Sequence, residues 1–205
     1  MDKTDCKKNK AVQYLDEALL LLLQKKSYDR ITVKNLIDKA GISRTSFYAN
    51  FVDIQDFFSH VVGDCFSDLK TYTGRYSYNL CLKEDFLQYY VKFYRYMGNH
   101  AELFAAMMGD NGLPSFRLHL IQEATSMWTD QFAGIRSDKR VCSQQQKDET
   151  ELLITYIVSA HVGLVRYWLF DHRHLSPDYM AEMLFELTWT ILNTHGYEKY
   201  IPASS

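Results

Sequence analysis

Hydrophobic residues recur along this chain at intervals of three and four positions, and sustained period-2 alternation is nearly absent. This spacing is typical of amphipathic helices rather than of strands. We therefore expect an all-α fold. The first helix is expected from about residue 8 to residue 26, with one apolar stripe made of Val12, Leu15, Leu19, Leu22 and Leu23.

Helix-capping residues predict three further helices in quick succession. Thr32 can cap a short helix that ends at Gly41, a residue suited to the left-handed conformation that follows a helix. Ser43 can cap a very short helix carrying Phe47 and Phe51. Asp53, with an acidic residue three positions later, resembles a capping box and opens a fourth helix that runs to about residue 71.

The rest of the chain also favours long helices. Residues 86–96 are dense in aromatic side chains. Three polar or glycine-rich segments predict loops, at 73–79, 109–114 and 134–147. Helices are expected between and after them, over about 115–132, 148–172 and 176–194, and the last begins with a Ser-Pro pair suited to a helix start.

Composition indicates an intracellular protein with a sizeable core. The 205 residues are 47% hydrophobic, with only 3 prolines and 9 glycines. Four scattered cysteines without CxxC spacing predict reduced thiols. No signal peptide is apparent, and the longest apolar run, residues 18–23, is far too short to span a membrane. We therefore expect a cytoplasmic protein with no membrane partner.

Charge alone does not indicate a nucleic-acid partner. The formal net charge is -2, and residues 1–60 carry 10 Lys and Arg against 8 Asp and Glu. This asymmetry is too mild to predict nucleic-acid binding without a motif.

The segment 32–51 supplies such a motif. Two short helices joined by Ala40-Gly41-Ile42 can pack against the first helix, with Ile42 and Phe47 inserted between them. The polar side of the third helix can then enter the major groove of double-stranded DNA. The candidate DNA-contacting residues are Thr32, Lys34, Ser43, Arg44, Thr45, Ser46, Tyr48 and Asn50. The alternative is an ordinary corner between two helices of a helical protein.

The stretch ITVKNLIDKAGISRTSFYANFVDIQDFF resembles the N-terminal domain of the TetR/AcrR family of transcriptional regulators. The threonine that opens the second helix, the Ala-Gly turn and the Phe47-Tyr48-x-x-Phe51 segment match in order and spacing. The resemblance implies a three-helix helix-turn-helix domain over residues 1–60 and a helical effector-binding and dimerisation domain over 61–205.

Two positions depart from the family pattern. Asn50 stands where histidine is usual, and Ile54 stands where a lysine usually contacts a DNA phosphate. Losing one phosphate contact weakens binding and lowers its salt dependence by about one unit of slope. Lys7, Lys8, Lys10 and Lys34 are candidates to compensate.

Residues 83–195 resemble, more loosely, the C-terminal domain of the same family. Such a domain implies an unknown small-molecule effector, and an interior rich in aromatic residues and methionines suits a flat or lipophilic ligand. The candidate ligand-binding residues are Tyr90, Phe93, Tyr94, Met97, Phe104, Met107, Met108, Phe116, Trp128, Tyr156 and His161. The alternatives are that these aromatic residues are plain core and that His161 is a hydrogen-bonded core histidine.

The last two helices carry broad apolar faces, which a symmetric homodimer would cover. The family resemblance likewise implies that these helices form a four-helix dimer interface. The candidate interface residues are Leu153, Ile157, Ala160, Leu164, Met180, Leu184, Leu187 and Ile191. The alternative is that both faces pack wholly inside one chain.

No signal for a metal, a cofactor or a catalytic constellation stands out. His172 and His174 resemble a metal pair, but a solvated helix end explains them better because no suitable third ligand accompanies them. The sequence therefore predicts a homodimeric repressor that a lipophilic or aromatic ligand releases from operator DNA. The alternative is an interaction module or coactivator that pairs with another regulator and binds DNA weakly or not at all. An enzyme built on a helical bundle is a third hypothesis.

Overall fold

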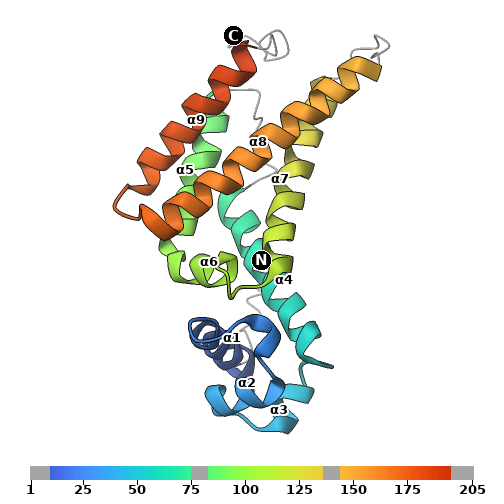
Figure 1. Ribbon diagram of the computed structural model, residues 1–205, viewed down its shortest axis with the longest axis vertical. Helices are drawn as coiled ribbons and strands as arrows, with labels where there is room; N and C mark the ends of the chain where they lie inside the picture. Colours follow the sequence, from blue (N-terminus) through green and yellow to red (C-terminus); the bar gives the residue numbers. More distant parts are fainter. Residues whose placement is uncertain (1–9, 75–82, 136–143, 195–205) are drawn as a thin grey trace, which may run out of the picture. The chain divides into compact units, whose positions relative to one another are not determined.

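The computed structural model describes residues 10–74, 83–135 and 144–194, and within these ranges it is helical and contains no strand (Figure 1). The all-α prediction is therefore confirmed. The elements are α1 (Lys10–Leu23), the 3-10 turn η1 (Tyr28–Arg30), α2 (Val33–Ala40), α3 (Arg44–Tyr48), α4 (Ile54–Thr73), α5 (Lys83–Asn99), α6 (Ala101–Met108), α7 (Pro114–Ile135), α8 (Gln144–Asp171) and α9 (Pro177–Thr194).

The chain folds into two compact units. Unit 1 comprises residues 1–65 together with 106–117, and unit 2 comprises residues 66–105 together with 118–205. The helix α4 is continuous from one unit into the other, as are α6 and α7. The segment 106–117 is tied to unit 1 by a hydrogen bond in which the Tyr28 amide donates to the Asn111 carbonyl at 3.0 Å.

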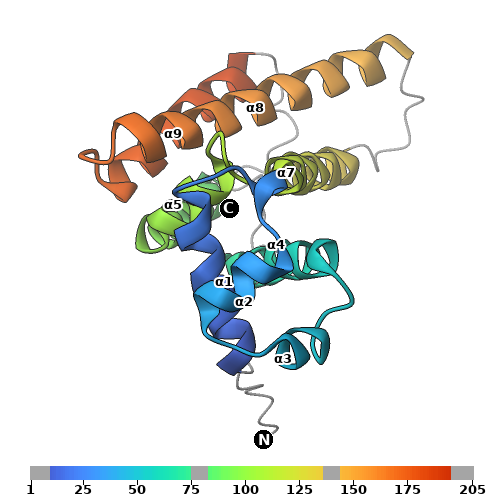
Figure 2. The same cartoon turned by 60° about the horizontal axis from the view of Figure 1, so that its bottom comes forward.

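In unit 1 the helices α1, α2, α3 and the start of α4 lie beside one another (Figure 2), and apolar side chains between them form a small core. The α1 side chains Leu15 and Leu19 and the α2 side chain Leu36 are fully buried. Phe47 of α3 is also fully buried, and its ring centroid lies 5.6 Å from that of Phe51 and 6.2 Å from that of Phe57 in α4. Aromatic contacts of this kind add to the stabilisation that burial provides.

Unit 2 is built around α5, which packs along α9 (Figure 1). The buried face of α5 repeats every three to four residues, as an amphipathic helix requires, and carries Phe86, Tyr90, Tyr94 and Met97. Close packing is visible at Gly98, where a Cβ atom would lie 3.0 Å from the Pro177 ring. A larger residue at position 98 would therefore require the Pro177 ring to shift by a few tenths of an ångström.

The structure bears on two sequence-based predictions, the absence of a membrane-spanning segment and the four reduced cysteines. Residues 147–171 of α8 form one described helix that is long and apolar enough to cross a membrane by length and composition, although the sequence contains no uninterrupted apolar run of that length. A third of its most apolar window is buried inside unit 2, where it contributes to the core. Of the four cysteines, Cys65 is buried in α4, and Cys6, Cys81 and Cys142 lie outside the described residues.

Candidate functional site

The predicted caps of α2 and α3 are confirmed. The Thr32 hydroxyl accepts a hydrogen bond from the Asn35 amide at 3.2 Å, and the Asn35 side chain accepts one from the Thr32 amide at 3.1 Å. This reciprocal capping box fixes the first turn of α2. Ser43 caps α3 in the same way, because its hydroxyl accepts from the Ser46 amide at 3.0 Å. Both helices therefore begin where the sequence predicts.

The turn between α2 and α3 depends on Gly41. Its φ of 68° lies in the left-handed region, and its amide bonds back to the Ile37 carbonyl. Side chains other than glycine adopt this conformation only at a cost of about 1–2 kcal/mol. A Cβ at this position would meet no atom within 4 Å, so the requirement comes from the backbone conformation and not from packing.

The structure places five predicted DNA-contacting side chains on the surface of unit 1. Arg44, Thr45 and Tyr48 are exposed on α3, where they line a shallow hollow together with Ala49. The Arg44 guanidinium lies over the Tyr48 ring, 5.6 Å from its centroid, and donates to the Tyr48 hydroxyl at 3.5 Å. Thr32 and Lys34 are exposed at the start of α2.

The side chains of the other three candidates form hydrogen bonds within unit 1. Ser43 and Ser46 form the α3 cap, and their hydroxyls lie 2.9 Å apart. Asn50 is half-buried, and its side-chain amide donates to the Ser46 carbonyl at 2.7 Å, so this amide group is held against the end of α3. The basic residues Lys7 and Lys8 lie outside the described residues.

The fourth helix starts with a variant of the predicted capping box. The Asp53 carboxylate accepts from the amides of Gln55 and Asp56, at 2.8 and 2.9 Å. The Asp56 carboxylate accepts instead from the Val52 amide at 2.9 Å, one residue before the helix cap. Ile54, which replaces the lysine that is usual in the TetR/AcrR pattern, is the first residue of α4 and is half-buried.

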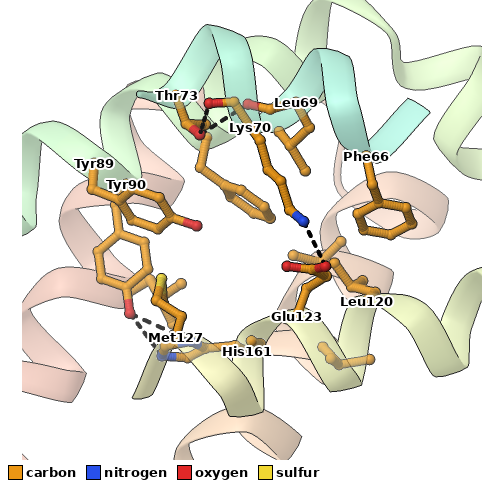
Figure 3. Close-up of a pocket in the computed structure, with 15 residues that line it drawn as sticks. Phe66, Leu69, Lys70, Thr73, Tyr89, Tyr90, Leu120, Glu123, Met127 and His161 are labelled. Atoms are coloured by element: carbon orange, nitrogen blue, oxygen red, sulfur yellow. Dashed lines mark hydrogen bonds and ion pairs between the residues drawn. The ribbon is translucent and has the colours of Figure 1, made fainter. Parts of the chain in front are cut away.

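Unit 2 contains a cavity of about 60 Å³ lined by residues from α4, α5, α7, α8 and α9 (Figure 3). Three of the predicted ligand-binding residues, Tyr90, Phe93 and His161, line it. Most of the other lining residues were not identified as ligand-binding candidates from the sequence. These residues are Phe66, Leu69, Lys70, Thr73, Leu120, Glu123, Ala124, Met127, Val162 and Val165. The aromatic α5 was a usable signal, whereas α4 and α7 carry only ordinary helical spacing.

The remaining predicted ligand-binding residues lie elsewhere. Tyr156 is 57% exposed on α8, so its ring faces solvent in this chain and not the cavity. The other seven are buried but do not line the cavity: Tyr94, Met97, Phe104 and Trp128 belong to unit 2, and Met107, Met108 and Phe116 belong to unit 1.

One side of the cavity is closed by a neutral polar cluster (Figure 3). His161 Nε2 lies 3.0 Å from the Tyr90 hydroxyl and 3.0 Å from the Thr188 hydroxyl. The Thr188 hydroxyl also donates to the Leu184 carbonyl at 2.8 Å, which assigns the Nε2 proton to the bond from His161 to Thr188. Burial lowers the pKa of His161 to about 3, and burial raises the pKa of the Tyr90 hydroxyl.

The other side of the cavity holds an ion pair. Lys70 Nζ of α4 lies 2.7 Å from the Glu123 carboxylate of α7 (Figure 3). Both side chains are mostly covered, with 33% and 22% of their surface exposed. The ring nitrogen His119 Nε2, on the same helix as Glu123, also lies 3.5 Å from this carboxylate.

The predicted dimer-interface residues divide between the core and the surface. Ile157, Met180 and Leu184 are buried within the chain, and Leu184 lines the cavity. Leu153, Ala160, Leu164 and Ile191 are half-buried, and Leu187 is exposed.

A different apolar stripe of α8 and α9 is exposed. On α8 its apolar members are Leu152, Tyr156 and Phe170, and the exposed residues Ser159, Gly163 and Arg166 lie between them at three- and four-residue spacing. On α9 the exposed apolar residues are Tyr179, Met183 and Leu187. This spacing is the one with which helices pack side by side.

Comparison with known proteins bears on both units. Residues 84–189, more than half of the chain, match the family described as "Transcriptional regulator C-terminal region". No curated protein matches the sequence significantly.

Solved structures share the whole fold. A TetR transcriptional regulator from Streptococcus agalactiae 2603V superposes with a TM-score of 0.60 at 19% identity, covering 87% of this chain and 93% of that one. A TetR-like regulator from Rhodococcus sp. RHA1 gives a TM-score of 0.61 at 15% identity, covering 91% and 96%. The dihydroxyacetone kinase operon activator DhaS gives 0.59 at 15% identity, covering 90% and 97%.

Proposed function

Since the chain belongs to the TetR family of transcriptional regulators, we propose that it is a homodimeric repressor. It binds operator DNA through α2 and α3 and leaves the DNA when a small lipophilic or aromatic ligand occupies the cavity of unit 2. Such a regulator acts in the cytoplasm, on double-stranded DNA.

The observation that carries DNA binding is the exposed face of α3. Arg44, Thr45 and Tyr48 follow a firmly capped helix start, and the buried Phe47 anchors the opposite face in the core. Arg44 is restrained by the Tyr48 ring, so less side-chain freedom is lost when its guanidinium binds a guanine edge or a phosphate. The exposed Lys34 can bind a phosphate at the start of α2.

The test is an electrophoretic mobility shift with DNA fragments that flank the chain's own gene. Binding that selects one fragment, and weakens steeply as salt rises, is the expected result. Binding that is equal for all fragments, or absent at low ionic strength, contradicts the proposal. Transcription in vitro from the selected fragment then distinguishes repression from activation.

The exposed stripe of α8 and α9 supports a homodimer. Large apolar side chains there are uncovered in the single chain, and Ser159 and Gly163 lie among them on α8. Small residues allow two helices to approach closely, so a second copy can cover the stripe. We therefore centre the interface on the exposed residues Leu152, Tyr156 and Leu187 rather than on Ile157 and Leu184, which already belong to the core.

A second candidate function is an interaction module that retains the fold but binds DNA weakly or not at all. Two observations favour it: the Asn50 amide is held by the Ser46 carbonyl, and Ile54 offers no charge at the start of α4. The substitution Ile54→Lys separates the two functions. In a DNA-binding repressor it raises operator affinity and steepens the salt dependence by about one unit of slope, whereas in an interaction module it changes neither.

A further inference from the structure

The cavity of unit 2, which is the effector site of the proposed repressor, is lined by charged side chains that indicate which class of ligand it binds. Its lining is mainly apolar, and Lys70 and Glu123 are the two residues with a formal charge among those that line it. Because they pair at 2.7 Å and are largely covered, neither charge is an ordinary surface group. Placing such a pair in an apolar lining costs desolvation free energy that a purely structural core avoids.

The cavity is too small to receive a ligand without rearrangement. A volume of about 60 Å³ holds only a few water molecules, whereas ligand pockets usually measure roughly 300–1,000 Å³. A ligand must therefore displace side chains as it enters. Figure 3 shows the ion pair and the Tyr90–His161 cluster on different sides of the cavity, so a ligand can meet a polar group on either side.

Lys70 and Glu123 differ in the partner that each retains when a ligand displaces the other. When an incoming anion binds Lys70, Glu123 keeps His119 as a partner on its own helix, at 3.5 Å. When an incoming cation binds Glu123, Lys70 is left without an acidic partner, because the described residues that line the cavity include no other carboxylate. Leaving a half-buried ammonium unpaired is costly, so the site favours an anion.

The rest of the lining specifies the body of the ligand. Phe66, Leu69 and Leu120 are buried apolar residues of the lining. Phe93 and Met127 add to this apolar surface. The Tyr89 hydroxyl points into the cavity from α5 (Figure 3).

The opposite side offers no charge for a second ionised group. His161 is neutral there, because burial holds its pKa near 3. The groups that face it are the hydroxyls of Tyr90 and Thr188, and the Trp128 ring at 6.1 Å. A ligand with two ionised ends therefore has a partner for only one of them.

We propose that the effector is an amphiphilic monoanion: a carboxylic acid with an apolar body, whose carboxylate replaces that of Glu123 on Lys70. The exchange removes the ion pair that ties α4 to α7 within unit 2. Since α4 continues as one helix into unit 1, this is the element through which the ligand acts on DNA binding.

The proposal is tested by calorimetric titration of the full chain with octanoate, octanamide and octylammonium, which share an alkyl body and differ in charge. Octanoate is expected to bind at least about tenfold more tightly than the other two. An aromatic acid, 4-phenylbutyrate, shows whether the apolar body is preferentially flat or linear. Equal binding of the neutral or cationic probe, or no saturable binding of either acid, overturns the proposal.

Substitutions at the pair should move affinity in opposite directions, which a merely structural role would not do. Lys70→Met is expected to weaken octanoate about tenfold and to leave octanamide unchanged. Glu123→Gln removes the competing carboxylate and is expected to tighten octanoate several-fold. The control is Lys83→Met, which removes an exposed lysine of α5 that does not line the cavity. If Lys70→Met leaves the preference for octanoate intact, the ligand does not bind as proposed.

These titrations contain no DNA, so the outcome is separable from that of the proposed function. Sequence-selective DNA binding without acid binding contradicts the proposed ligand class and supports the proposed repressor. Acid binding without DNA binding supports the proposed ligand site and contradicts the proposed repressor.

Discussion

Stability below neutral pH should depend on His161. The side chain is buried beside Tyr90 and Thr188, and burial lowers its pKa to about 3, against an ordinary value near 6.5. Between these two pH values the unfolded chain binds a proton that the folded chain excludes. The contribution of His161 to stability is therefore fully present above pH 6.5 and falls as the pH drops toward 3.

The size of the effect follows from the two pKa values. Lowering the pH from 7 to 5 leaves His161 neutral in the folded chain and protonates it almost fully in the unfolded chain. The free energy of unfolding should then fall by about 2 kcal/mol because of this group alone. This figure is an upper value, since His161 lines the cavity and water there would soften the desolvation.

Urea unfolding at pH 7, 6 and 5, followed by circular dichroism, measures this dependence. The matched variant is His161→Gln, which can still hydrogen-bond Tyr90 and Thr188 but does not titrate. Titrating groups elsewhere in the chain are the same in both proteins, so their contributions cancel in the comparison. The wild type should lose about 2 kcal/mol more than the variant between pH 7 and 5. Equal losses would show that His161 is not held neutral by burial.

Three further predictions concern the turn, the dimer and the DNA contact. Gly41→Ala should lower the stability of unit 1 by about 1–2 kcal/mol because of its left-handed φ, whereas Gly63→Ala, in an equally open position on α4, should raise it by about 0.5–1 kcal/mol; chemical denaturation checks both. Gly163→Arg should convert the dimer to a monomer in light scattering. The matched control is Gly63→Arg, which should leave the dimer intact, because both glycines are exposed in helices with no atom within 4 Å of an added Cβ. A Gly163→Arg protein that stays dimeric would exclude the α8 stripe from the interface. Arg44→Ala should weaken operator binding by about ten- to a hundredfold in fluorescence anisotropy, while Arg117→Ala, an exposed arginine of α7, should change it little. Equal effects of the two substitutions would mean that Arg44 contributes only general charge.

The local features of unit 1 could be predicted from sequence because each depends on a few neighbouring residues. Thr32, Gly41 and Ser43 specify two caps and a turn through bonds that span three or four positions. Helix boundaries were less predictable: α1 ends at Leu23 although helical spacing continues to residue 26. The bounds of α5 and α6 were not predicted, since their apolar residues do not separate one helix from the next.

The cavity could be predicted only in part, because it depends on contacts between distant residues. The aromatic α5 and His161 drew attention to Tyr90 and Phe93, which line the cavity. Nothing in sequence spacing pairs Lys70 with Glu123, since the two positions lie 53 residues apart. The periodicity of α8 also could not distinguish the buried Ile157 from the exposed Tyr156 one position earlier, because both faces of the helix are apolar.

The most direct test of the account is DNase footprinting of the full-length protein on the fragment that it selects. The account predicts protection of two related half-sites whose centres lie one helical turn, about 34–36 Å, or a multiple of it apart, as two copies of α3 in a symmetric dimer require. It also predicts that the protection weakens as salt rises. A single protected site without internal symmetry, or no protection at low ionic strength, would contradict it.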